Sequence, residues 1–170
     1  MTAVAAVVAA AAAFAVTAGG AWLLVRRRLG ELARAHRYDR SLAVIVLDLD
    51  DFKAINDRLG HLAGDEALAE AGVCVREVVR SADVACRIGG DELAVILPEA
   101  SAEDADRIYQ RLQDALAARA GATAAGRLSV SAGVAEATRE DDAAMFFRRA
   151  DEALYKAKAQ GKSQIARATG

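Results

Sequence analysis

Two short acidic stretches of this 170-residue chain carry the residue types that hold divalent metal ions. Residues 87–93 read Arg-Ile-Gly-Gly-Asp-Glu-Leu, so Asp91 and Glu92 directly follow two glycines, and Asp48 and Asp50 end an apolar run earlier in the chain. Carboxylate oxygens are the ligands that Mg²⁺ prefers, and glycines without a Cβ let a bulky phosphorylated ligand approach the backbone. The pattern predicts a magnesium site that handles phosphate groups, with a solvated acidic rim at two strand ends as the alternative.

Both acidic stretches lie at the ends of predicted β-strands. Residues 42–47 are a continuous apolar run rich in β-branched side chains, which is typical of a strand buried on both faces. Strand-like runs at 83–88 and 94–97 flank Gly89-Gly90, which predicts a β-hairpin whose glycines adopt positive φ at the tip. If the first strand lies beside this hairpin, the acids converge, and a cation between them would relieve their repulsion.

The remaining segments predict helices that alternate with strands. The long helix is expected to open at Gly64, with Asp65 at its N-terminus as a cap or as a favourable charge for the helix dipole. The order β-α-α-β-β-α-β-α-β predicts an α+β fold of the ferredoxin-like or palm type, with a mostly antiparallel central sheet flanked by helices. The other predicted helices lie at 52–58, from 101 onward and at 140–159, and the other predicted strands at 128–137 and 163–166.

The first segment differs in composition from the rest of the chain. Residues 3–25 contain no charged side chain, and about 20 apolar residues suffice for a helix to cross a bilayer. Arginines fill positions 26–28, and such a cluster stays on the cytoplasmic side. We therefore expect a transmembrane helix over 1–25, a helical connector over 26–40 and a cytoplasmic domain over 41–170. A cleaved signal peptide is disfavoured, because its positive charge would precede the apolar run.

Composition excludes little beyond this. The net charge of −2 shows no basic excess, so a nucleic-acid partner is not expected. The two cysteines, Cys74 and Cys86, form no CxxC pair and have no histidine cluster nearby. We expect both to be buried, reduced thiols rather than metal ligands or a disulfide.

Four separated blocks of the chain resemble the GGDEF family of diguanylate cyclases. They are Asp-Leu-Asp-Asp-Phe-Lys-Ala-Ile-Asn-Asp at 48–57, Gly-His-Leu-Ala-Gly-Asp at 60–65, the heptapeptide at 87–93, and Arg-Ala-Asp-Glu-Ala-Leu-Tyr-Lys-Ala-Lys at 149–158 with the Gly-Lys that follows at 161–162. The resemblance covers residues 41–166. It implies that two GTP molecules condense to cyclic di-GMP with release of two pyrophosphates, in a homodimer whose subunits each supply one GTP. It also implies a bacterial protein, so the membrane that the first segment is expected to cross as a single span is the inner membrane.

The resemblance implies a metal and catalytic centre. Asp48 and Asp91 match the metal ligands, assisted by the backbone carbonyl of Leu49. Glu92 matches an acid/base helper or a further metal carboxylate, so Asp91 and Glu92 are the candidate catalytic residues. The implied cofactor is Mg²⁺, or Mn²⁺ in its place. A neighbouring divalent ion keeps a carboxylate ionised, as a base accepting the 3′-hydroxyl proton must be.

The resemblance also implies substrate contacts. Asn56 and Asp65 match the residues that recognise guanine, since an amide can bond its N3 and N2 edge and a carboxylate can accept from N1–H and N2–H₂. By themselves, these two residues are equally typical of a turn and of a helix cap. The implied phosphate contacts are made by Gly89, Gly90, Phe52, Lys53, Lys158 and Lys162, the last of which replaces a frequent Arg and so loses bidentate geometry.

Arg80 and Asp83, in Arg-Ser-Ala-Asp, match the family's RxxD site, where product binds and inhibits. Arginine can bond a phosphate or stack on guanine, and aspartate can accept from the guanine N–H edge. A surface salt bridge would have the same sequence pattern.

Two departures from the family pattern keep other functions open. Nothing here matches the usual front segment Asp-x-Leu-Thr-Gly-Leu-x-Asn-Arg, and Leu93 replaces the usual Phe. The missing segment favours a non-catalytic receptor for GTP or cyclic di-GMP, whereas the intact Asp48, Asp91 and Glu92 favour the enzyme. An adenylate-type cyclase of the palm fold is a further alternative, which Asn56 and Asp65 disfavour.

Overall fold

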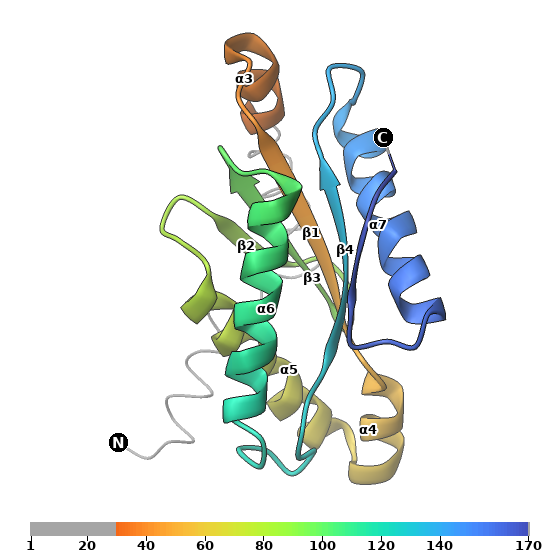
Figure 1. Ribbon diagram of the computed structural model, residues 1–170. Coiled ribbons are helices and arrows are strands. Elements are labelled where there is room, and N and C mark those ends of the chain that lie inside the picture. The colour runs from red at the N-terminus through yellow and green to blue at the C-terminus, as the bar shows by residue number, and fades with distance from the viewer. Residues whose placement is uncertain (1–29, 170) are drawn as a thin grey trace.

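The computed structural model describes residues 30–169, which form one mixed sheet with helices on both faces (Figure 1). Within these residues the sheet has five strands in the order β2-β3-β1-β4-β5. The pairs β2–β3, β3–β1 and β1–β4 are antiparallel, and β4–β5 is parallel. The elements are α3 (Gly30–Tyr38), β1 (Leu42–Leu49), α4 (Phe52–Leu59), α5 (His61–Val78), β2 (Val84–Arg87), β3 (Glu92–Pro98), α6 (Ala102–Ala118), β4 (Val130–Glu136), α7 (Ala143–Ala159) and β5 (Ile165–Arg167).

The central strand β1 is buried on both faces, as its unbroken apolar sequence predicts. Successive side chains of a strand point to opposite faces, so β1 supplies two cores. Ile45 and Leu47 pack in a cluster with residues of α5 and α6, whereas Val44 and Val46 pack in a second cluster with residues of α3 and α7. The predicted order of helices and strands gave the correct architecture, an α+β sheet flanked by helices.

Two local predictions were wrong. Helix α5 begins at His61 rather than at Gly64, so Asp65 is its fifth residue and not its cap. The reason is Gly60, whose φ of 86° separates α4 from α5 and lets the second helix start at once. At the hairpin tip, neither Gly89 nor Gly90 has positive φ, so their role there is not left-handed geometry.

The predicted transmembrane helix over 1–25 lies outside the described residues. Among residues 30–169, no helix is long and apolar enough to span a bilayer. Helix α3 contributes Leu32 and Ala35 to the second core cluster. Cys74 and Cys86 are buried and unpaired, as predicted.

Candidate functional site

The structure brings the two acidic stretches together at one end of the central strands. Asp48, the seventh residue of β1, lies directly opposite Glu92, the first residue of β3. The backbone N–H of Leu49 donates to the carbonyl oxygen of Asp91 at 3.2 Å. The hairpin tip is therefore bonded to the end of the first strand, which brings Asp48, Asp91 and Glu92 to the same end of the sheet.

The carboxylates of this cluster stand partly withdrawn from water and close to one another. Burial raises the pKa of Asp48, a hydrogen bond from Lys158 lowers it, and the charge of Asp91 raises it again. Burial also raises the pKa of Glu92, with further contributions from the charges of Asp48, Asp151 and Asp91. Asp151, on α7, adds negative charge to the site, and its type and position in the sequence did not predict this. Crowded, partly buried carboxylates of this kind are stabilised by a cation.

In the structure, that cation is a lysine. The Nζ atom of Lys158, from the last turn of α7, lies 2.7 Å from Oδ2 of Asp48. Within residues 30–169, no three acidic, histidine or cysteine side chains form a ready-made cage for a metal ion. The donor set nevertheless fits a hard divalent ion, because Asp48 and Glu92 offer carboxylate oxygens whose raised pKa a bound cation would lower.

The first glycine of the hairpin makes room for the side chain of Glu92. A Cβ added to Gly89 would lie 2.4 Å from Oε2 of Glu92, whereas one added to Gly90 would meet no atom within 4 Å. Arg87 stabilises the turn, donating to the carbonyl oxygen of Gly89 at 3.0 Å through Nε and to that of Gly90 at 2.6 Å through Nη2. The turn thus needs glycine for a close approach, and it leaves the backbone at Gly90 open.

The two candidate guanine-recognition residues lie on the paired helices α4 and α5. Asn56 is half-buried on α4, and Asp65 is exposed on α5. The residue next to Asp65 is the buried Gly64, and a Cβ there would lie 2.0 Å from Oδ1 of Asn56. The Asn56 amide therefore lies against the backbone of α5 in the space that this glycine leaves.

The remaining phosphate candidates are at the start of α4 and beyond the end of α7. Phe52 and Lys53 open α4, with Phe52 packed against the core and Lys53 exposed. Lys162, in the turn after α7, bonds Oδ1 of Asp51 at 2.6 Å rather than an acid of the central cluster.

Asp50 was predicted to join the acidic cluster, but in the structure its carboxylate has a different role. It is buried, and its carboxylate accepts hydrogen bonds from Ser131 Oγ at 2.6 Å, Ser129 Oγ at 2.9 Å and the backbone N–H of Ser163 at 3.0 Å. Asp50 therefore joins β1, the start of β4 and the turn that carries Lys162, and it leaves Asp48 as the member of its pair that faces the acidic cluster. Ser129 and Ser131, alternating on a predicted strand, were the available signal for this network.

Arg80 and Asp83 form a tight turn before β2. The backbone N–H of Arg80 donates to Oδ2 of Asp83 at 2.7 Å, and the N–H of Asp83 donates to the Arg80 carbonyl at 3.0 Å. This turn lies at the opposite end of β2 from the Gly-Gly hairpin tip. The Asp83 carboxylate already stabilises the local backbone, while the Arg80 residue is exposed.

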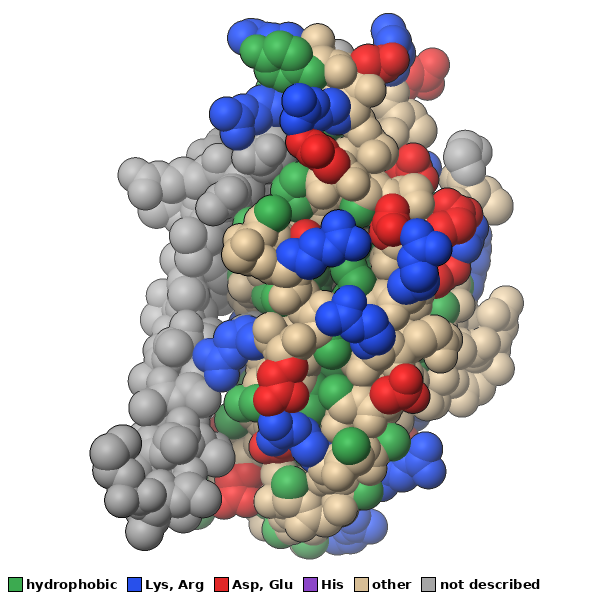
Figure 2. All heavy atoms as spheres, turned by 60° about the vertical axis from the view of Figure 1, so that its left-hand side comes forward, with side chains coloured by type: hydrophobic (Ala, Val, Ile, Leu, Met, Phe, Trp, Pro, Cys, Tyr) green, Lys and Arg blue, Asp and Glu red, His purple; other side chains and the backbone are tan. Residues whose placement is uncertain are grey.

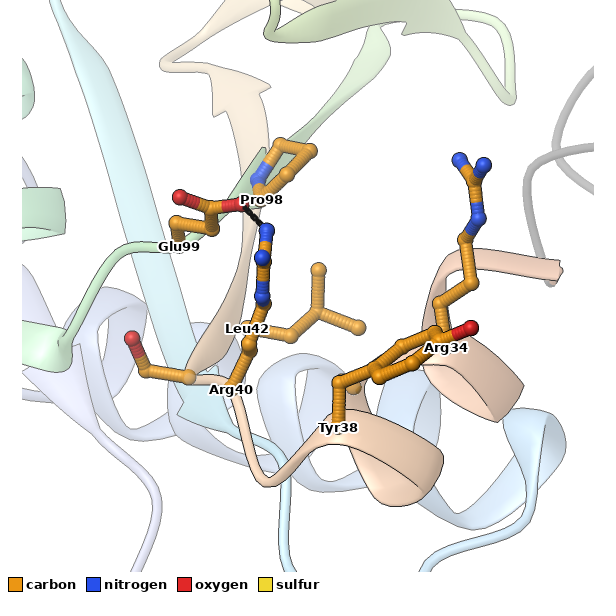
Figure 3. A pocket seen from close by; sticks show the side chains of 8 residues that line it. Arg34, Tyr38, Arg40, Leu42, Pro98 and Glu99 are labelled. Atoms are coloured by element: carbon orange, nitrogen blue, oxygen red, sulfur yellow. Dashed lines mark hydrogen bonds and ion pairs between the residues drawn. The ribbon is translucent and has the colours of Figure 1, made fainter.

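The hollow drawn in Figure 3 lies away from this site. It encloses about 290 Å³ between α3 and the ends of β1 and β3, where Leu42 pairs with Pro98. Arg40 reaches across it to the carboxylate of Glu99. Because Asp48 follows Leu42 by six positions along β1, this hollow and the acidic cluster are about 20 Å apart. On the face shown in Figure 2, acidic and basic side chains are interspersed, so no field of one sign marks a ligand site there.

A mixed sheet flanked by helices, with an acidic Gly-Gly hairpin bonded to the end of its central strand, defines a GGDEF-like α+β domain. The family described as "Diguanylate cyclase, GGDEF domain" matches residues 23–164, and the chain belongs to this family.

Similar proteins of known name and structure agree with this assignment. The chain is 42% identical over 132 residues to diguanylate cyclase DgcS of Shewanella oneidensis, covering 78% of this chain and 44% of the relative. It is 36% identical to response regulator PleD of Caulobacter vibrioides, covering 73% of this chain and 28% of the relative. The chain thus spans less than half the length of these relatives.

Among solved structures, the GGDEF domain of TpbB (YfiN) from Pseudomonas aeruginosa superposes with a TM-score of 0.79 at 36% identity, covering 86% of this chain and 88% of that one. The GGDEF domain of DgcB from Caulobacter crescentus, solved in complex with c-di-GMP, has a TM-score of 0.76 at 28% identity, covering 81% and 84% of the two chains.

Proposed function

We propose that this domain is a diguanylate cyclase, which joins two GTP molecules into cyclic di-GMP. The observation that carries the proposal is the meeting of Asp48 on β1 with Asp91 and Glu92 of the hairpin, with Lys158 among them. This cluster would be of little use to a domain that only binds nucleotide. The named cyclases among the relatives, and the c-di-GMP bound to a similar GGDEF domain, support the same substrate and product.

The chemistry assigns each group a task. The 3′-oxygen of one GTP attacks the α-phosphorus of the other, the bond from that phosphorus to the bridging oxygen breaks, and pyrophosphate leaves. Glu92, close to the metal candidates, takes the 3′-hydroxyl proton, as a base must be in reach of the proton it removes. Repeating the step with the roles reversed closes the ring and releases the second pyrophosphate.

A divalent ion, Mg²⁺ or Mn²⁺, would be held by Asp48 and Asp91 with the carbonyl of Leu49 and Glu92 nearby, and it would neutralise charge on the triphosphate. Asn56 and Asp65 would recognise guanine. The hairpin backbone, the start of α4, Lys158 and Lys162 would hold the phosphates. Lys158 would exchange Asp48 for phosphate oxygens when the loaded nucleotide binds.

Three further parts of the proposal concern regulation and assembly. Two copies of the domain face each other, because each subunit supplies one GTP. Arg80 and Asp83 bind product on the surface and slow the enzyme. The apolar residues 1–25 anchor the chain in the bacterial inner membrane, with the domain on the cytoplasmic side.

A single assay tests the function. The full chain, purified in detergent, is incubated with GTP and Mg²⁺, and the products are resolved by chromatography. We expect cyclic di-GMP and pyrophosphate in a ratio of one to two, and a loss of about 10²- to 10⁴-fold in rate for Glu92→Gln. Folded protein that binds GTP without forming product would be a receptor, and product from ATP would indicate an adenylate-type cyclase.

A further inference from the structure

Both lysines that we propose to bind the triphosphate form ion pairs with aspartates in the structure. Lys158 Nζ lies 2.7 Å from Asp48 Oδ2, and Lys162 Nζ lies 2.6 Å from Asp51 Oδ1. Asp48 lies near the end of β1, and Asp51 lies in the short link from β1 to α4. The two lysines come from the end of α7 and the turn after it, beside that end of β1 (Figure 1). We call this pair of ion pairs the double clasp.

The backbone, and not only the side chains, holds the second ion pair in place. Lys162 and the following Ser163 both have left-handed φ angles, of 63° and 48°, and Asp51 has a φ of 57°. The N–H of Ser163 donates to the buried carboxylate of Asp50, the residue before Asp51. The turn that carries Lys162 is therefore bonded to the segment that carries its acidic partner.

The two ion pairs open in different ways. Asp48 is a proposed metal ligand, so its carboxylate would be bound by the divalent ion, and Lys158 would then be free to bind phosphate. Asp51 is not among the proposed ligands, and its side chain is 65% exposed. Lys162 is therefore released only when phosphate oxygens replace Asp51.

We propose that Asp51 sets the affinity of the site for a nucleoside triphosphate, by competing with the phosphates for Lys162. The inference rests on the proposed function, because it assumes that a triphosphate occupies this site. Asp51 is a positioning residue that holds Lys162 in place before the nucleotide binds. Because this ion pair must break when the triphosphate binds, it lowers the affinity for the nucleotide. An exposed ion pair of this kind weakens binding by about 1.4- to 5-fold.

The test removes the charge of Asp51 and preserves its shape. Asn tolerates the left-handed conformation, and the Asp51 side chain makes no cap hydrogen bond to α4, so Asp51→Asn keeps the backbone. Calorimetric titration of the full chain uses Mg²⁺ with 3′-deoxy-GTP, which lacks the attacking hydroxyl. We expect Asp51→Asn to bind about 1.4- to 5-fold more tightly than wild type at low salt, with a smaller difference at high salt because exposed charges are screened.

A double-mutant cycle tests whether Asp51 changes the affinity through its ion pair with Lys162 or only through its negative charge. In a Lys162→Met background, Asp51→Asn is expected to change affinity no further. Asp57→Asn, which removes an exposed acid of α4, the helix that Asp51 precedes, serves as the matched control and should leave the affinity as in wild type.

Three results would overturn the inference. Equal affinity of wild type and Asp51→Asn, or an equal gain in the Lys162→Met background, would refute the clasp and leave the proposed function standing. Folded wild type that binds no analogue would refute the proposed function and the inference with it.

Discussion

The close contact between Gly64 and Asn56 allows a sharp test of the guanine recognition that we propose for Asn56. An ideal Cβ on Gly64 would lie 2.0 Å from Oδ1, 2.9 Å from Cγ and 3.3 Å from Nδ2 of Asn56. Contacts this short cannot persist, and the atoms affected are the far end of a flexible side chain. Gly64→Ala should therefore turn the Asn56 amide out of its place and leave the two helices where they are.

The magnitudes separate the effect on folding from the effect on binding. Replacing a helix-interior glycine gains about 0.5–1 kcal/mol, and forcing a side chain off its rotamer costs about 0.5–1.5 kcal/mol, so the net change in unfolding free energy is within about 1 kcal/mol. Loss of one hydrogen bond to guanine is worth about 0.5–1.5 kcal/mol, or about 2- to 12-fold in affinity. We expect near-normal stability together with weakened nucleotide binding.

Urea unfolding and calorimetric titration with 3′-deoxy-GTP measure the two quantities. Asn56→Ala should weaken binding as much as Gly64→Ala does, and the double variant should be no weaker than either. Wild-type affinity in folded Gly64→Ala would refute the reasoning. Additive losses in the double variant would show that Gly64 acts on something other than Asn56.

Three further predictions follow from the hairpin and its surroundings. Gly89→Ala should lower kcat by about 10²-fold or more, because its Cβ displaces the Glu92 carboxylate, while Gly90→Ala should have a much smaller effect; equal losses in the steady-state rates of the two would contradict this. Glu92→Gln should stabilise the protein by no more than about 1 kcal/mol above pH 5 and not at pH 4, in urea unfolding at each pH. Burial raises the pKa of Glu92 above its ordinary 4.5, so the folded protein loses stability as pH rises through the raised pKa and the side chain becomes charged. A difference between wild type and Glu92→Gln that did not depend on pH would contradict burial as the cause. Arg80→Ala should raise the product yield at high turnover, because it removes the guanidinium and leaves the backbone turn with Asp83 intact; unchanged inhibition would place the product elsewhere.

Much of the site's framework could be predicted from the sequence, because it depends on local patterns. The apolar run ending at Asp48 indicated a strand buried on both faces, and glycines between strand-like runs indicated the hairpin. Whether this strand lies beside the hairpin could not be decided from the sequence. The structure shows that it does, because Asp48 pairs with Glu92. The four sequence blocks gave the family.

The sequence did not give the contacts that depend on packing between distant segments. Gly64 was expected to open a helix, and Gly89 was expected to act through turn geometry or ligand approach, yet both leave room for a side chain. The start of α5 was misplaced because Gly60 alone suffices to separate two helices. Lys158 and Lys162 could be recognised as a pair, but nothing in their spacing predicts aspartate partners more than a hundred residues away.

The central position of β1 also has a consequence for biosynthesis. This early strand has no neighbour until β3, ending at Pro98, and β4, ending at Glu136, have been made. While the ribosome translates that length, a six-residue apolar run stays unpaired and prone to associate with other nascent chains. The end of the sheet that carries the acidic cluster thus forms only after both partner strands of β1 have been made, and chaperone demand should be greatest before then.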